Sequence, residues 1–380
     1  MKIKQATLAA VMALGLFGAA HADLTIGMVL PLTGPASGLG IPAKNGAALW
    51  PKSIAGENLK VVMLDDATDP ATGVKDAQRL VTQDNVDVLV GSVATPVAIA
   101  IADVSAQSGT AQLALSPAAL PPGKDKWMFR LPQSNDVMAY AVVQHMKAQQ
   151  VKTIGFLGYT DAYGELWLKP MQAEAEKNGM KIVAVERFGR ADTSVTAQAL
   201  KLTSANPDAI LIVASGSGAG LPQKAIMERG YKGKVYQTHA AATQDLMRTA
   251  GKDAEGAFVV SGPATVAEQL PDSHPSKKAA IAFVTAYEKA YGPGSRNQFA
   301  GHAADVPTVL EKAVPIALKK AKPGTPEFRA ALRDAFETMG RTTLAHGVLE
   351  WTPQDHWGYT NETGVVLKVV NGQFKLEQPQ

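Results

Sequence analysis

The chain has 380 residues, of which 46% are hydrophobic and 19% are charged, and its formal net charge is +3. This length fits two domains of ordinary size, and the composition is that of a globular protein. The absence of cysteine excludes disulfide frameworks, cysteine-ligated metal sites and thiol catalysis. The small net charge supplies no strong basic field, so we expect no nucleic-acid partner.

The N-terminal segment, residues 1–22, predicts a secretory signal peptide. Two lysines among its first four residues precede an apolar run from Ala6 to Ala20, and an Ala-His-Ala tripeptide then gives a cleavage pattern before Asp23. The apolar run is shorter than the ~20 residues that a membrane-spanning helix needs. We therefore expect cleavage of this segment and a mature protein that is soluble in the periplasm.

The first part of the mature chain alternates short apolar runs with helical stretches. The runs predict strands at Leu24–Leu30, Leu59–Leu64, Val86–Val90 and Gln112–Leu115. The stretches between them predict helices near Ile41–Ile54, Ala71–Thr82 and Pro96–Ser105. This alternation, with nearly continuous apolar strands, predicts a parallel sheet that helices cover on both faces.

The pattern starts again at Lys152–Gly158, which shares the tripeptide Thr-Ile-Gly with the first strand. A helix at Ala162–Asn178 and further strands follow, at Lys181–Arg187, Ala209–Val213 and Val235–Thr238. The chain then predicts more helices and two final strands, at Ser276–Ala290, Ala300–Lys320, Pro326–Thr338, Gly347–Trp351 and Val365–Val370. We interpret this as a weak repeat of whole lobes.

The predicted fold is of the α/β class, with two doubly wound Rossmann-like lobes joined by a hinge. We expect residues 23–140 and 262–345 to form the N-terminal lobe, and residues 141–261 and 346–380 to form the C-terminal lobe. Ligands bind outside the carboxyl ends of parallel strands. Two such edges facing each other predict one cleft, where hinge closure buries a ligand.

Catalytic and metal-binding signatures are absent from the sequence. It contains no His-Glu-x-x-His, no Gly-x-Ser-x-Gly and no phosphate-binding Gly-x-x-x-x-Gly-Lys-Ser/Thr, and its seven histidines lack metal-ligand spacing. The segment Gly216–Leu221 lacks the third glycine and the later acid of a dinucleotide site, so it predicts a tight turn. The run Asp65–Pro70 predicts a helix cap at Asp69. We expect no catalytic residue, metal or cofactor.

Six segments carry a resemblance to a known family when they are taken in order. They are Ile26–Gly40, Asp65–Pro70, Gly91–Ala98, Ser116–Ala119, Asp161–Gly164 and Gly347–Trp351. The chain resembles the periplasmic solute-binding proteins of the branched-chain amino acid (leucine/isoleucine/valine-binding) type, which serve ABC importers. The resemblance implies a type I periplasmic binding protein fold without catalysis, a small-molecule ligand and a membrane permease as partner. We expect a monomer.

The resemblance also implies ligand contacts. In the family, the loop that matches Thr95 and the backbone that matches Ala118 and Ala119 hold the ligand carboxylate, and an aromatic that matches Tyr163 closes on the ligand. The physics agrees at Thr95, because a hydroxyl and the free N–H groups of a helix start form an anion site. The alternative for each residue is ordinary turn or core packing.

Two departures from the family bear on the ligand. Leu120 stands where amino acid binders have a threonine, and residues 239–241, His-Ala-Ala, lack the acid that faces the ligand ammonium. A buried ammonium without its countercharge costs several kcal/mol. We therefore expect an uncharged pocket of hydroxyl and amide groups, and a ligand without an α-ammonium group.

The loop Thr33–Pro42 and the pair Thr238-His239 resemble the branch that takes aromatic carboxylates. We therefore add Ser37 and His239 to the candidate ligand contacts, with Tyr159 and Phe299 as candidate stacking walls. The alternatives are an amino acid or amide binder whose acid lies elsewhere, an exported ligand sensor, and an enzyme that no motif supports. We expect Arg130 to form a structural pair at a strand end.

Overall fold

The computed structural model describes residues 23–377, so the predicted signal peptide lies outside the described residues. The first sheet has six strands in the order β2-β3-β1-β4-β5-β6, and all pairs except β2–β3 are parallel. Its strands are β1 (Leu24–Leu30), β2 (Ser53–Ile54), β3 (Glu57–Asp65), β4 (Val88–Gly91), β5 (Ala111–Ala114) and β6 (Met128–Arg130).

Three helices connect the strands of the first sheet: α1 (Ser37–Ala47), α2 (Pro70–Thr82) and α3 (Thr95–Ser108). The helices α2 and α3 pack together over one face, where Leu80 and Ile101 join the sheet residues Val29 and Leu89 in one apolar cluster. Asp69 accepts a hydrogen bond from the Thr72 amide, so the predicted cap of α2 is confirmed.

The second sheet has seven strands in the order β15-β14-β11-β10-β9-β7-β8. Its parallel strands are β7 (Thr153–Tyr159), β8 (Lys181–Phe188), β9 (Ala209–Val213), β10 (Lys234–Gln237) and β11 (Phe258–Ser261), and its antiparallel edge is β14 (Val365–Val370) and β15 (Gln373–Leu376). The accompanying helices are α4 (Asn135–Ala148), α5 (Ala162–Lys177), α6 (Thr196–Ser204), α7 (Ser217–Met227) and α8 (Gln244–Ala250).

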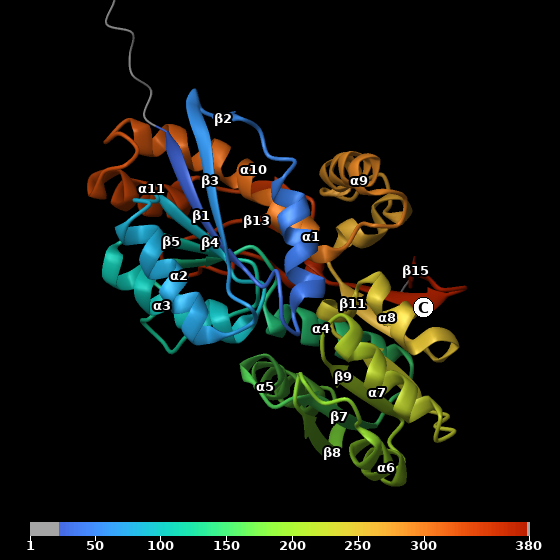
Figure 1. Ribbon diagram of the computed structural model, residues 1–380. Coiled ribbons are helices and arrows are strands. Elements are labelled where there is room, and N and C mark those ends of the chain that lie inside the picture. The colour runs from blue at the N-terminus through green and yellow to red at the C-terminus, as the bar shows by residue number, and fades with distance from the viewer. Residues whose placement is uncertain (1–22, 378–380) are drawn as a thin grey trace, which may run out of the picture.

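After the second sheet the chain returns to the first (Figure 1). Trp50 donates a hydrogen bond from Nε1 to the Ala303 carbonyl at 2.8 Å, which fixes α10 against the segment that follows α1. The remaining elements are α9 (Lys277–Tyr291), α10 (Gln298–Leu318), α11 (Pro326–Thr338), the hairpin β12 (Thr342–Leu344) and β13 (Gly347–Leu349), and the 3₁₀ turns η1 (His239–Ala241), η2 (Gly251–Ala254), η3 (Pro263–Gln269) and η4 (Asn361–Thr363).

The fold is therefore of the predicted α/β class, with two parallel-sheet lobes. The strands predicted at Leu24–Leu30, Ala209–Val213 and Val365–Val370 are confirmed residue for residue. The helix predicted near Ile41–Ile54 is present with other bounds, because α1 begins earlier, at Ser37, and ends at Ala47, before Pro51 disfavours its continuation. The sequence reading also missed α4, whose buried positions lie around much of its circumference.

Two predicted lobe boundaries fall inside continuous elements. The boundary after residue 140 lies within α4, which contacts α5 and β11 of the second sheet along its length. The boundary after residue 345 lies in the turn of the β12–β13 hairpin, and Trp351 beyond it packs on Phe129 of the first sheet with ring centroids 5.1 Å apart. The exact division into lobes stays a prediction.

A buried polar cluster joins the segments that cross between the sheets. The rings of His302 and His346 lie 4.3 Å apart, and Gln133 donates from Nε2 to the His346 carbonyl at 2.7 Å. Asp305 accepts a hydrogen bond from the Ala345 amide at 2.8 Å. A Cβ atom at Gly301 would approach the His346 ring to 2.2 Å, so only glycine fits there. The crossing segments are thus packed tightly around polar side chains.

The Asp305 carboxyl makes folding stability depend on pH. Burial raises the pKa of Asp305 from 3.8 to about 7, so the folded protein keeps a proton that the unfolded chain releases near pH 4. Stability contributed by this group is present at pH 4 and is lost as pH rises toward 7. One pKa unit corresponds to about 1.4 kcal/mol, so the effect amounts to several kcal/mol.

We predict that Asp305→Asn gains stability relative to the wild-type protein as pH rises from 5 to 7, with little further gain above pH 7. Circular dichroism melting temperatures at half-unit pH steps measure the difference. Asp103→Asn on the exposed side of α3 is the matched control, and its melting temperature is expected to change with pH in parallel with that of the wild-type protein. A difference for Asp305→Asn that stays constant across this range contradicts the prediction.

Candidate functional site

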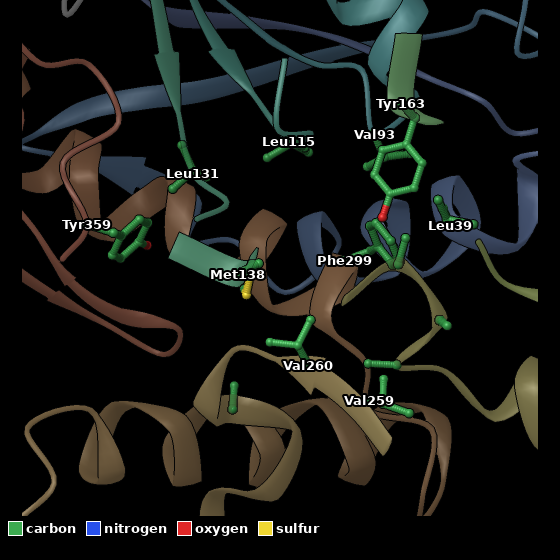
Figure 2. Close-up of a cluster of buried hydrophobic side chains, with 14 of the residues drawn as sticks. Leu39, Val93, Leu115, Leu131, Met138, Tyr163, Val259, Val260, Phe299 and Tyr359 are labelled. Atoms are coloured by element: carbon green, nitrogen blue, oxygen red, sulfur yellow. The ribbon is translucent and has the colours of Figure 1, made fainter. Parts of the chain in front are cut away.

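A small cavity lies between the two lobes, at the carboxyl ends of both sets of parallel strands. Its volume is about 10 Å³, about the space of one water molecule, so the closed lobes must separate to accept a larger ligand. Residues from the first lobe and α10 line one side, namely Leu39, Val93, Thr95, Pro117 and Phe299. Residues from the second lobe line the other, namely Tyr163, Arg190, Ser215, His239 and Ala240. Figure 2 shows the Tyr163 hydroxyl pointing toward Phe299, with Leu39 and Val93 near it.

The order of strands and loops explains why these residues meet. Thr95 follows β4, Ser215 follows β9 and His239 follows β10, each within a few residues of the strand end. Residues at these positions gather at one edge because parallel strands all end there. Tyr163 reaches the cavity from the start of α5, where Asp161 accepts the amide hydrogen bonds of Tyr163 and Gly164.

The lobes touch each other beside the cavity. A Cβ atom at Gly216 would lie 3.4 Å from Leu39 Cδ1, and one at Gly38 would lie 2.7 Å from Asp245 Oδ2. Leu39 and Gly38 belong to α1 of the first lobe, whereas Gly216 and Asp245 belong to the second. The structure therefore has a closed cleft, with the start of α1 against the second lobe.

The first lobe offers hydrogen-bond donors at the start of α3. Thr95 is the first residue of this 14-residue helix, is 2% exposed and lines the cavity. No hydrogen bond of its hydroxyl is found within residues 23–377. The first N–H groups of a helix have no intrahelical partner, and the helix dipole favours a negative charge there. This end of the cavity suits a carboxylate.

The second lobe places a guanidinium in the cavity wall. Arg190 is 13% exposed, donates from Nε to Asp161 Oδ2 and donates from Nη1 to Ser215 Oγ at 3.1 Å. Its charged group lies 4.2 Å from the centre of the Tyr159 ring. The expectation of a pocket lined only by hydroxyl and amide groups is therefore wrong, because the loop after β8 adds a cation.

His239 supplies a neutral imidazole to the same wall. The side chain is 2% exposed, and in the described part of the chain neither ring nitrogen has a hydrogen-bond partner. Burial lowers the pKa of His239 to about 3, so the ring is neutral at physiological pH, with one donor and one acceptor nitrogen. Buried polar atoms in folded proteins are nearly always paired. An unpaired ring beside a cavity is therefore suited to a bound partner.

A match to a sequence profile along nearly the whole described chain identifies the protein family. The sequence profile described as "Periplasmic binding protein" matches residues 23–373. The chain belongs to the periplasmic binding protein family. Its relatives identify the branched-chain amino acid type. A "Leu/Ile/Val-binding protein homolog 3" of Brucella melitensis is 29% identical over 258 residues, which are 64% of this chain and 68% of that protein.

Solved structures of periplasmic binding proteins have the same fold. An extracellular ligand-binding receptor from Rhodopseudomonas palustris is 45% identical, with a TM-score of 0.92 over 94% of this chain and 99% of that one. A solute-binding protein of an ABC transporter from R. palustris, in complex with benzoate, is 18% identical, with a TM-score of 0.76 over 93% and 95% of the two chains. These matches show the type I periplasmic binding protein fold.

The family implies a periplasmic location. Among residues 23–377, no helix combines the length and the apolar character needed to cross a membrane. The cleavage site predicted before Asp23 borders the segment outside the described residues and stays a prediction.

The structure brings four of the eight predicted contact residues of this periplasmic binding protein into the cavity wall. These are Thr95, Tyr163, His239 and Phe299, and their binding roles remain predictions. Tyr159 lies behind the wall, where its hydroxyl accepts from the Ser215 amide at 3.3 Å.

The other three predicted contacts lie outside the lining residues. Ser37 is half-buried as the first residue of α1, and Ala119 is half-buried after β5. The carbonyl of Ala118 accepts a hydrogen bond from Arg130 Nε at 2.9 Å, so the structural role expected for Arg130 is confirmed. Pro117 lines the cavity in place of the two alanines.

Sequence reasoning missed Arg190, Ser215, Leu39 and three further lining residues, Val93, Pro117 and Ala240. Arg190 lies two residues after the end of β8, and the rule that ligands bind beyond strand ends applies there too. The position of Arg190 just beyond a strand end was therefore visible in the sequence, but no motif distinguished this arginine from its neighbours. Leu120, which departs from the family pattern, packs on the cluster around Ala118 and Met128 and does not line the cavity.

We predict that the His239 imidazole stays neutral from pH 8 to pH 5, because burial opposes its charged form. Ring nitrogen chemical shifts from nitrogen-15 NMR measure the protonation state, and the spectrum of His239→Gln assigns the signal. His274, which is half-buried, provides an internal comparison at a less buried site. A His239 titration with a midpoint near 6.5 would show that the ring is exposed to solvent in the free protein.

Proposed function

We propose that this periplasmic binding protein is the substrate-binding component of an ABC importer and that its ligand is a small aromatic carboxylate. One observation carries the choice of ligand class. The cavity wall contains a guanidinium, from Arg190, and no carboxylate among its ten lining residues. A buried ammonium has no countercharge in such a wall, whereas a carboxylate finds hydrogen-bond donors at the start of α3.

The acid that pairs with Arg190 supports this proposal. Asp161 uses Oδ1 to accept the amide hydrogen bonds of Tyr163 and Gly164 at the start of α5, and it uses Oδ2 for Arg190. Both oxygens are therefore already engaged. Turning this carboxylate toward a ligand ammonium would break the cap of α5 and leave Arg190 without its ion-pair partner. The free-energy cost would therefore exceed that of turning a solvent-exposed acid toward the same ammonium.

The apolar part of the wall favours a ring. Phe299, Tyr163 and His239 present aromatic faces or edges, and Leu39 and Val93 add aliphatic surface. An aromatic ring buries a large apolar area in such surroundings and gains from edge and face contacts with other rings. The ligand carboxylate then lies at the start of α3, near Thr95.

Closure links binding to transport in this proposal. A ligand that contacts both lobes stabilises the closed form, and the membrane permease recognises that form. An exported ligand sensor would bind in the same way and deliver nothing, so uptake of labelled ligand by cells with and without the gene separates the two roles.

An amino acid ligand is the second candidate, because a relative is described as a Leu/Ile/Val-binding protein homolog. This candidate requires a carboxylate for the ammonium, and none lines the cavity in the closed structure. The benzoate complex of a protein with the same fold, at 18% identity, indicates that the fold itself does not select either class.

We predict that calorimetry with the mature protein, stripped of carried-over ligand by unfolding and refolding, detects binding of benzoate or 4-hydroxybenzoate at micromolar concentration or below. Leucine, isoleucine and valine give no heat in the same experiment, because their ammonium groups are left unpaired. Tight binding of one of these amino acids, with the aromatic acids silent, refutes the proposed ligand class.

We predict that Thr95→Val weakens benzoate binding about 10- to 100-fold. The variant keeps the side-chain shape and loses one hydrogen bond to a charged group, which contributes about 1.5–3 kcal/mol. Thr82→Val, on the exposed end of α2, is the control and leaves the affinity unchanged. Unchanged affinity in Thr95→Val would move the carboxylate away from the start of α3.

A further inference from the structure

The guanidinium of Arg190 is held in one orientation at the cavity wall. Asp161 fixes Nε, Ser215 fixes one Nη1 hydrogen, and the ring of Tyr159 supports the planar group at 4.2 Å. The Tyr159 hydroxyl in turn contacts both the carbonyl and the amide of Ser215, at 3.4 and 3.3 Å. A planar fork held on three sides loses little conformational entropy when it binds an acceptor.

Part of this fork has no partner in the protein. Arg190 carries five N–H groups, and within residues 23–377 its hydrogen bonds use Nε and Nη1, while none is found for Nη2. Arg190 lines the cavity, so its N–H groups without a protein partner lie close to the space where a ligand would bind.

The two donor groups belong to opposite lobes. Thr95 and the start of α3 are in the first lobe, whereas Arg190 follows β8 in the second. Aromatic and aliphatic side chains, including Phe299 and Leu39, line the cavity with them. A ligand that satisfies both ends needs one polar group on each side of an apolar middle.

The charge at the Arg190 end limits what the second polar group is. Asp161 already neutralises the guanidinium, so a second full negative charge there would face the Asp161 carboxylate as well. A neutral acceptor oxygen takes the free N–H groups without that repulsion. A ring hydroxyl accepts from the arginine and still has a proton to donate, and the neutral His239 in the same wall offers an acceptor nitrogen.

We infer that Arg190 is a specificity-determining residue that selects aromatic acids carrying a hydroxyl at the ring position opposite the carboxylate. This inference rests on the proposed function, because it takes the carboxylate to lie at α3. The ligand then bridges the lobes, with its carboxylate on the first and its hydroxyl on the second. Such bridging couples recognition of the hydroxyl to closure.

The test compares benzoate with 4-hydroxybenzoate by calorimetry on wild type, Arg190→Gln and Arg187→Gln. Arg187 is the matched control, since it lies near the end of β8, three residues before Arg190, and pairs with Glu165 at the surface, outside the cavity lining. We expect wild type to bind 4-hydroxybenzoate at least about tenfold more tightly, as one hydrogen bond to a charged group predicts. Arg190→Gln loses this preference, and Arg187→Gln keeps it.

Each other outcome has a distinct meaning. A preference that persists in Arg190→Gln overturns the inference and leaves the proposed function intact. Equal weakening of both acids in that variant also overturns it, because Arg190 would then hold the carboxylate. If neither acid binds wild type, the proposed function itself fails. Should Arg190→Gln not fold by circular dichroism, Arg190→Lys, which keeps the charge and lacks the fork, is expected to reduce the preference, and an unreduced preference overturns the inference.

Discussion

The site depends on one geometric constraint: two parallel sheets present their carboxyl ends to the same cleft. Parallel strands require crossover helices, and every such crossover begins at that edge. The loop after β4 therefore delivers Thr95, and the loop after β10 delivers His239, although 144 positions separate them in the chain. Polar chemistry accumulates between the lobes because each lobe folds in this way, and the closed cleft then removes it from water.

A second constraint is electrostatic and lies in the pair of Arg190 and Asp161. The carboxylate caps α5 with one oxygen and binds the guanidinium with the other, so both of its oxygens already have partners within the protein. The guanidinium keeps N–H groups that have no partner within residues 23–377. The wall thus gains hydrogen-bond donors and almost no net charge. This differs from a wall with an exposed acid, which would favour a zwitterion.

Much of the fold was predictable from the sequence. Strands that are buried on both faces form continuous apolar runs, so β1 and β9 were predicted with the correct bounds. The start of α1 was not predicted correctly, because its first turn lies in a segment rich in glycine and proline, and such a composition predicts a loop. The three-residue strand β6 is too short for any periodicity to appear.

The site was only partly predictable, for a different reason. Thr95 and His239 follow strands in recognisable patterns, so local sequence points to them. Arg190 acquires its place through contacts with Asp161 and Ser215, and these depend on the tertiary packing of three separate loops. The same limit applies to Ala118, whose carbonyl a buried arginine occupies. Spacing in the sequence does not reveal which polar groups are already satisfied.

The packing around His346 has an evolutionary consequence. A side chain at Gly301 has no room beside the imidazole, so the segments that cross between the lobes are packed there with little room to compress. Observed affinity is the intrinsic affinity scaled by the fraction of molecules ready to bind. Substitutions at this position that shift the balance between open and closed forms would therefore change the observed affinity without changing any residue of the cavity wall.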